Sequence, residues 1–382
     1  VQQGMSVQVL EAHTVGHGGS GRNVGLVNAG LWTPPDEVER TLGQVAGKKL
    51  NHALAAAPDL VFSLIQQHQI ECEPLRHGTL HCATNSAGLR QLKQRLAQQV
   101  QRNAPVTLLG ASNTEQRTGS HQFLGALLDP RAGTVQPLSY ALGLAHAAAK
   151  AGAVIHTQSP ALTHQHNGTH WLIKTAHGSI TADKLIHATN AYDTLSPHNT
   201  AFTSVDYVQF ATRPLSHKQR ATVLPNGEGC WDTNQVMSSF RMDESGRLII
   251  GGVGSLNGNG NGNGKAKHTH INWAHRKLKT LFPHITQYEF EYMWDGHIAM
   301  TSDHLPKITR HGTNSISLYG YSGRGIGPGT LFGKAAANWA FSGDEGQLPV
   351  AITDPKPETY TNFKASYFDM GATLSHWLSC RF

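Results

Sequence analysis

A glycine-rich stretch near the N-terminus, Val15-Gly-His-Gly-Gly-Ser-Gly-Arg-Asn-Val-Gly-Leu26, is the starting point for interpreting this chain. It follows the alternating, β-rich segment Ser6-Val-Gln-Val-Leu-Glu11, which predicts a strand that ends in a carboxylate. In a dinucleotide-binding fold, an acidic residue at that place accepts hydrogen bonds from ribose hydroxyls. Glu11 is therefore a candidate ribose ligand, and an ordinary strand-end carboxylate is the alternative interpretation.

A second glycine-rich loop, Gly320-Tyr-Ser-Gly-Arg-Gly-Ile-Gly-Pro-Gly329, leads into a helix expected over residues 330–341. Without a Cβ, such a backbone can approach a flat ring or a phosphate closely. The free N–H groups at the start of a helix favour an anionic or electron-rich group. Each loop alone could be a flexible turn, but two of them together with the Glu11 strand favour a nucleotide cofactor.

The residues before the first strand resemble the end of a helix with a stop at Gly4. A helix end, a glycine and a strand ending in Glu form the second half of a βαβ dinucleotide unit. The first half, a strand followed by a GxGxxG turn, does not precede the Glu11 strand in this sequence. We therefore expect a nucleotide-binding domain whose first βα unit is missing.

Composition excludes several classes of protein. Of 382 residues, 39% are hydrophobic, 15% are charged and 40 are Gly, which excludes charge-driven disorder, collagen and a disulfide-rich mini-scaffold. The net charge of +6 comes from scattered basic residues, so no nucleic-acid partner is expected. The four Cys show no metal-type spacing and predict reduced thiols in a cytoplasmic protein. No run approaches the roughly 18 apolar residues of a membrane span.

The remaining pattern predicts alternating helices and strands. We expect a helix that opens at Thr33-Pro-Pro-Asp36, with Thr33 as its N-cap, and continues to about residue 69. Asn257–Gly264 consists of four Asn-Gly pairs and predicts a mobile surface loop. Further helices are expected at 86–103, 137–152 and 271–282, and strands at 76–82, within 153–189 and 205–252, and at 287–299 and 314–319.

Six motifs in one order carry a resemblance to a known family. They are Val9-Leu-Glu-Ala, Gly19-Ser-Gly-Arg-Asn-Val-Gly25, Asp129-Pro-Arg-Ala-Gly133, Ala188-Thr-Asn-Ala-Tyr192, Arg247-Leu-Ile-Ile-Gly-Gly252 and Tyr321-Ser-Gly-Arg-Gly-Ile-Gly327. The chain thereby resembles the D-amino-acid-oxidase-type flavoproteins, which include glycine and sarcosine oxidases. The Ser-Gly-Arg-Asn loop and the segment Trp294–Pro306 look most like the branch of gamma-glutamylputrescine oxidase and pipecolate oxidase.

The resemblance implies a fold of mixed α/β and α+β class in two domains. A discontinuous Rossmann-like FAD-binding domain would comprise residues 1–70, 129–200 and 296–346. An antiparallel-sheet substrate domain would comprise 71–128 and 201–295, and a tail, 347–382, would pack on the FAD domain. The implied FAD-binding residues are Glu11, Ser20, Gly21, Arg22, Asn23, Gly25, Leu26, Ala161, Thr189, Asn190, Gly323, Arg324, Gly325, Ile326, Gly327 and Thr330.

The implied reaction is oxidation of the CH–NH bond of a small amine or amino acid to an imine, with O₂ or a quinone as the electron acceptor. Some sarcosine oxidases attach flavin through a Cys near the segment that matches Trp294–Met300, where this chain has none, so we expect FAD to be bound non-covalently. Arg241, on an expected strand, is a candidate carboxylate clamp because guanidinium binds carboxylate bidentately. Tyr321, beside the second loop, is a candidate wall of the active site. A structural Arg and a core aromatic are the alternatives.

Two rival functions follow from the same residues. The missing GxGxxG turn suggests an FAD-deficient remnant of such an enzyme, and the pI of 9.1 suggests a tRNA-modifying flavoenzyme of the same superfamily. No metal site is expected, because the pairs His164-x-His166 and His268-x-His270 have no evident third ligand.

Overall fold

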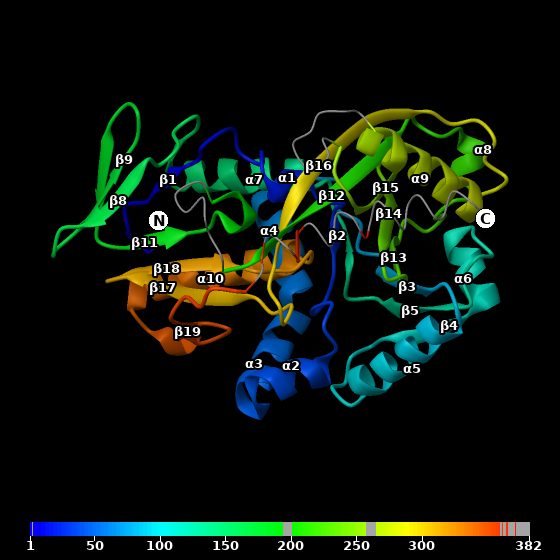
Figure 1. Ribbon diagram of the computed structural model, residues 1–382, viewed down its shortest axis with the longest axis horizontal. Helices are drawn as coiled ribbons and strands as arrows, with labels where there is room; N and C mark the ends of the chain where they lie inside the picture. Colours follow the sequence, from blue (N-terminus) through cyan, green and yellow to red (C-terminus); the bar gives the residue numbers. More distant parts are fainter. Residues whose placement is uncertain are drawn as a thin grey trace.

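The computed structural model describes residues 1, 3–193, 201–256, 265–359, 361, 364–365 and 371 (Figure 1). Five sheets fall into two regions: one large mixed sheet with its helices, and a group of small sheets around the long helix α10 (Ile326–Ser342). This arrangement confirms the mixed α/β and α+β class. The Asn-Gly loop expected at Asn257–Gly264 lies outside the described residues.

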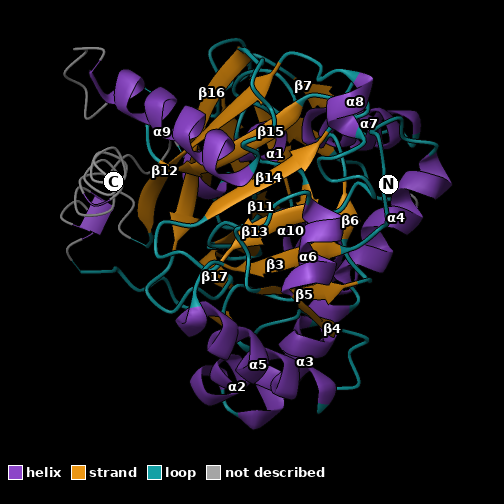
Figure 2. Ribbon diagram, turned by 90° about the vertical axis from the view of Figure 1, so that its right-hand side faces the viewer, coloured by secondary structure: helices purple, strands orange, loops and turns teal. Residues whose placement is uncertain are grey.

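The large sheet has the strand order β16-β12-β15-β14-β13-β3-β5-β4 and is antiparallel except for the parallel pair β13–β3. Its strands are β3 (Thr79–Ala83), β4 (Thr107–Gly110), β5 (Gly125–Asp129), β12 (Thr203–Thr212), β13 (Gly229–Asp232), β14 (Ser238–Met242), β15 (Leu248–Val253) and β16 (Phe290–Met300). Helix α9 (Lys265–Leu281) lies across this sheet (Figure 2) and buries Leu278 and Leu281 in the same core cluster as Phe210 and Phe240. Three further helices lie around the sheet: α5 (Ser86–Val100), α6 (Ala111–Thr118) and α8 (His217–Arg220).

The second region contains the sheet β11-β18-β17-β19, the three-stranded sheet β10-β9-β8, and the pairs β1–β7 and β2–β6. Its strands are β1 (Gln8–Leu10), β2 (Leu26–Val27), β6 (Gly133–Thr134), β7 (Val154–His156), β8 (Thr163–His166), β9 (Trp171–Lys174), β10 (Ser179–Ala182), β11 (Leu185–His187), β17 (Lys307–Gly312), β18 (Ser315–Tyr319) and β19 (Ile352–Thr353). The parallel pair β1–β7 confirms the strand expected before Glu11.

Helix α10 (Ile326–Ser342) is central to this region, and its Phe332 and Trp339 belong to a core cluster with Leu318 of β18. The other helical segments are α1 (Gly19–Arg22), α2 (Pro35–Leu42), α3 (Gln44–Ala55), α4 (Ala57–His68), α7 (Pro137–Lys150), and the 3-10 turns η1 (Asn190–Tyr192) and η2 (Glu345–Gln347).

The single helix expected from Thr33 to residue 69 is wrong, because the chain divides there into α2, α3 and α4. Gly43 interrupts the first pair with φ +83°, a conformation that favours glycine. Pro58 stands in the first turn of α4, where a missing N–H costs nothing. The expected Thr33 cap is also wrong, since Pro34 is the N-cap and makes no side-chain capping bond.

The sequence pattern does not predict several of the observed helices and strands. The segment from β4 through β5 was not assigned, and neither was β17. Helix α10 begins at Ile326 rather than at residue 330, so the second glycine loop already contains the first helical turn. Of the described helices, none combines the length and the apolar character required to cross a bilayer.

Candidate functional site

A cavity of about 2120 Å³ lies between the two regions, and segments far apart in the sequence line it. Both glycine-rich loops are among them. Of the residues expected at the site, those that line the cavity are Glu11, Ser20, Arg22, Asn23, Leu26, Ala161, Thr189, Asn190, Tyr321, Gly323, Arg324, Gly325, Ile326 and Thr330.

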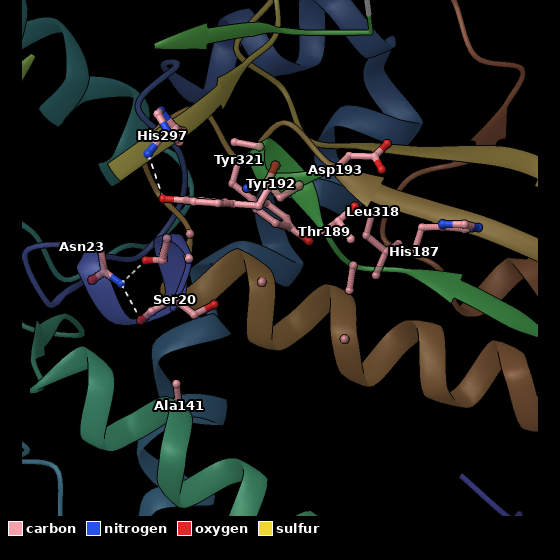
Figure 3. Close-up of a pocket in the computed structure, with 18 of the residues that line it drawn as sticks. Ser20, Asn23, Ala141, His187, Thr189, Tyr192, Asp193, His297, Leu318 and Tyr321 are labelled. Atoms are coloured by element: carbon pink, nitrogen blue, oxygen red, sulfur yellow. Dashed lines mark hydrogen bonds between the residues drawn. The ribbon is translucent and has the colours of Figure 1, made fainter. Parts of the chain in front are cut away.

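Asn23 shapes the first loop. Its side-chain amide donates to the carbonyls of Gly19 and Ser20, at 2.9 and 3.0 Å, as Figure 3 shows. Its Oδ1 accepts the backbone N–H of Gly25 at 2.8 Å. A Cβ at Gly21 would lie 2.2 Å from the carbonyl oxygen of Gly16, so only glycine fits this turn. The loop is thus held by its own side chain and by close backbone packing.

Strand β16 joins the two loops. Trp294 Nε1 donates to the Arg22 carbonyl at 2.8 Å, and Arg22 Nη1 donates to the Asp295 carbonyl at 2.8 Å. Farther along the strand, the Ile298 side chain is the group nearest to a Cβ built on Gly323, at 3.8 Å. The same strand therefore fixes the first loop and borders the second.

The start of α10 presents a face without side chains to the cavity. Gly325, Gly329 and Gly333 recur at i, i+4 and i+8, so they share one side of the helix, and all three line the cavity. A Cβ at Gly325 or Gly333 would meet no atom within 4 Å, and one at Gly329 only the Tyr321 ring at 3.9 Å. A flat group can therefore approach the helix backbone from this side.

Another group of expected residues surrounds the end of β11. Thr189 and Asn190 follow this strand, and Asn190 Oδ1 accepts the Gly320 N–H at 3.1 Å. Tyr192 projects into the cavity (Figure 3), where its hydroxyl accepts the His297 backbone N–H at 2.9 Å. Glu11 lies at the end of β1 and accepts the His13 N–H at 2.9 Å.

Four expected residues do not line the cavity: Gly21, Gly25, Gly327 and Arg241. Arg241 is buried, and its Nε donates to the Val24 carbonyl at 2.6 Å. Gly25 has φ +90°, and a Cβ there would lie 2.7 Å from Arg241 Nε. The position of Arg241 behind the first loop gives no support to the carboxylate-clamp hypothesis; it supports the structural alternative.

Two residues of the large sheet that the sequence analysis does not identify, Trp231 and His81, form a buried cluster with the expected Arg324. The Arg324 guanidinium lies over the Trp231 ring at 4.1 Å, and the His81 ring stacks on Trp231 at 3.3 Å between centroids. Trp231 and Arg324 line the cavity. No local motif marks Trp231 or His81, because β13 and β3 meet only in the folded sheet.

The electrostatics of this cluster favour an anion. Burial, and then repulsion from Arg95, lowers the pKa of Arg324 to about 9. Burial also lowers the pKa of Arg95 to about 10 and that of His81 well below its ordinary value. Arg324 Nη2 is buried and, among the described residues, has no hydrogen-bond partner. A negatively charged group would both pair this nitrogen and stabilise the guanidinium.

Gln209 supplies a complementary group. It lies buried on β12 and lines the same cavity, and its Oε1 is without a hydrogen-bond partner in the described part of the chain. The nearby Tyr207 hydroxyl is engaged with Ser239 at 2.9 Å, and burial raises its pKa. The cavity thus offers an unpaired donor on Arg324 and an unpaired acceptor on Gln209.

The expectation that no third histidine accompanies His164 is wrong. Ring nitrogens of His164, His187 and His311 lie within 4.8 Å of one another. The second pair was misplaced, because His268 and His270 lie on helix α9 and not on a strand.

Comparison with known proteins gives a consistent picture. The family of FAD-dependent oxidoreductases called DAO matches residues 1–339. The chain is 27% identical over 368 residues to a probable oxidoreductase OrdL of Haemophilus influenzae, covering 94% of this chain and 82% of that protein. It is 28% identical over 340 residues to gamma-glutamylputrescine oxidoreductase of Escherichia coli, covering 88% and 78%. The structure of glycine oxidase from Geobacillus kaustophilus has a TM-score of 0.70 at 18% identity, covering 89% of each chain.

Proposed function

The chain belongs to the DAO family of FAD-dependent oxidoreductases, and from that premise we propose that it oxidises the CH–NH bond of a small amine or amino acid that carries a carboxylate. The observation that carries the substrate class is the buried Arg324 guanidinium, stacked on Trp231, with an unpaired Nη2 in the cavity. The group proposed to accept a hydrogen bond from the substrate amine is the Oε1 atom of Gln209, which has no partner among the described residues.

The residues of the cavity fit FAD. The glycine face of α10 leaves room that any Cβ would fill, and the backbone at the start of this helix suits an electron-rich ring edge or a phosphate. Glu11 would hold the ribose, the Gly19–Asn23 loop would border the pyrophosphate and flavin, and the segment from Gly323 to Thr330 would cover the pyrimidine end. No Cys stands in Trp294–Met300, which supports non-covalent binding.

Bound FAD supplies a two-electron acceptor for oxidation of the amine to an imine, which water then hydrolyses. The protein's own contribution is orientation. Arg324 would pair the substrate carboxylate, and Gln209 Oε1 would accept an N–H of the substrate amine. Trp231 and Tyr321 are apolar walls that exclude water from the reacting carbon.

The test is the kinetics of the FAD-loaded protein with matched amines that differ only by a carboxylate. Arg324→Met should raise KM for the carboxylate substrate at least about 30-fold, since a buried charge-assisted hydrogen bond is lost. KM for the plain amine should change less than about threefold. Arg324→Lys should restore part of the difference because it keeps the charge without the planar fork.

Equal effects on both substrates would reject the carboxylate proposal. A protein that stays colourless with added FAD would reject the proposed function altogether and favour the remnant. Peroxide formation during turnover would identify O₂ as the acceptor, whereas turnover with a quinone alone would identify a dehydrogenase.

The described cysteines, Cys72, Cys82 and Cys230, are buried free thiols, which supports the cytoplasmic setting.

A further inference from the structure

We propose that His164, His187 and His311 form a binding site for a divalent transition-metal ion of the Zn²⁺ type. The site would join the three-stranded sheet to the sheet that carries β11 and β17. Ring nitrogens of the three residues lie within 4.8 Å of one another. This site is separate from the proposed oxidation and does not depend on it.

The sheet β11-β18-β17 presents two of the three histidines on one face. His187 on β11 and Thr309 on β17 are both partners of Ser317 on the strand between them. His311 stands two residues beyond Thr309 on β17, and its ring lies beside that of His187. The two ring centroids are 4.0 Å apart.

A β-bulge positions the His311 ring. The register of β17 against β18 shifts between Arg310 and Gly312, which leaves His311 as the extra residue of the bulge. Bulges redirect a side chain at the cost of a ladder bond, and they are frequent beside functional sites. Gly312 has φ +139°, so the chain uses glycine to form this irregular turn.

The other sheet contributes His164 from β8. Trp171 of the neighbouring β9 fastens this sheet in place, because its Nε1 donates to the Thr313 carbonyl at 2.8 Å. A Cβ on Gly312 would lie 2.9 Å from the same indole ring. The three rings therefore come from separate strands that are held together by packing close to the cluster.

The ring nitrogens are poorly satisfied without an ion. Nδ1 of His164 and Nε2 of His187 are buried, and among the described residues neither has a hydrogen-bond partner. A hydrogen bond inside the cluster joins the Nε2 atoms of His164 and His311 at 2.9 Å.

The geometry suits three ligands and one open position. Zn²⁺ binds imidazole nitrogen at about 2.0–2.1 Å, which places nitrogens of a tetrahedral site about 3.4 Å apart. The observed nitrogens lie within 4.8 Å of one another, and one pair of them is 2.9 Å apart. His164 and His187 also line the large cavity, so the fourth position is open to water or to an anionic ligand there. Imidazole favours Zn²⁺, Cu²⁺ and Ni²⁺ over Mg²⁺ or Ca²⁺.

The experiment measures metal binding by the full chain and does not use enzyme activity. The protein is stripped with a chelator, dialysed against buffered Zn²⁺ and its metal content counted, and Co²⁺ is used as a second probe for its tetrahedral visible absorption. Variants His187→Asn and His311→Asn are compared with His177→Asn. His177 is an exposed histidine of the turn between β9 and β10 and serves as the matched control.

We expect one tight Zn²⁺ per chain in the wild type and in His177→Asn, with affinity at least about 100-fold weaker in the other two variants. Zn²⁺ should also raise the Tm of the wild type and leave that of His311→Asn unchanged. Equal Zn²⁺ affinity in all four proteins would overturn the proposal and leave a hydrogen-bonded histidine stack.

A measurement on the wild type alone covers the case in which a variant does not fold. Histidine-directed acylation is mapped by mass spectrometry with and without Zn²⁺. Protection of His164, His187 and His311, with His177 still modified, would support the site. Unchanged labelling of the three would reject it.

Discussion

The two walls of the cavity differ in the kind of chemical group that each presents to a ligand. The wall built on α10 and the first loop consists of glycine and backbone atoms. The absence of side chains at these glycines leaves the space in which a flat ligand can lie against the backbone. The wall on the side of the large sheet offers Gln209 and Trp231, and the buried guanidinium of Arg324, from the second glycine loop, lies over the Trp231 ring. A large planar ligand needs close approach over an area, whereas a small ligand needs a few directional contacts in a dry pocket.

The largest effect should follow from filling the glycine wall. Gly329→Leu places an isobutyl group in the space beside Tyr321 and should weaken FAD binding about 100-fold, because overpacking a rigid site costs several kcal/mol. FAD affinity is measured by flavin fluorescence. Lys334→Leu, at an exposed position of the same helix that points away from the glycine face and does not line the cavity, is the control and should leave FAD affinity unchanged. Unchanged FAD binding in Gly329→Leu would show that α10 does not form the cofactor wall.

An intermediate effect should separate the two buried arginines. Arg241→Met removes the bond to the Val24 carbonyl and should lower the free energy of unfolding by about 2 kcal/mol, as expected for a lost hydrogen bond from a charged donor. Denaturant titration measures this loss. KM should change by the same factor for carboxylate and plain amines, in contrast to Arg324→Met. A selective loss for the carboxylate substrate would instead restore Arg241 as the clamp.

The smallest effect concerns the edge of the cavity. Asp206 hydrogen-bonds His297 at 2.6 Å and raises its pKa above 6.5. Because the folded pKa is raised, this stabilisation is complete below about pH 6.5 and is lost as the pH rises through the folded value. Asp206→Asn should therefore cost less than about 1 kcal/mol near pH 6, and less still at pH 8, since the pair is half exposed. A pH-independent difference in unfolding free energy would contradict the assignment.

The two walls also differ in how far the sequence predicted them. The glycine wall is encoded locally, so the loops at residues 19–25 and 320–329 were recognisable from spacing alone. The polar wall is encoded only in part. Arg324 lies within the second loop, whereas Trp231 and His81 come from β13 and β3, which meet only in the folded sheet. The sequence places Arg241 on an expected strand and makes it a candidate carboxylate clamp. Only the folded structure shows that its side chain donates to the Val24 carbonyl.

The histidine cluster shows the same limit. His164 and His166 were considered as a pair because they are close in sequence, yet the actual neighbours of His164 are 23 and 147 positions away, at His187 and His311. The bulge that aims His311 depends on the register of β17 against β18, which no local pattern encodes. Boundaries erred for a related reason: at Gly43, a single backbone angle overrode helical periodicity.

The position of α10 late in the chain has a consequence for biosynthesis. The ribosome releases β1 and the first glycine loop early, but the helix that completes the cofactor wall ends only at Ser342. Until α10 has been synthesised, the slot proposed for FAD lacks one of its two sides. If the proposed site is correct, we therefore expect the coenzyme to bind only after α10 has emerged, and a chain that stops before Ile326 should bind no flavin.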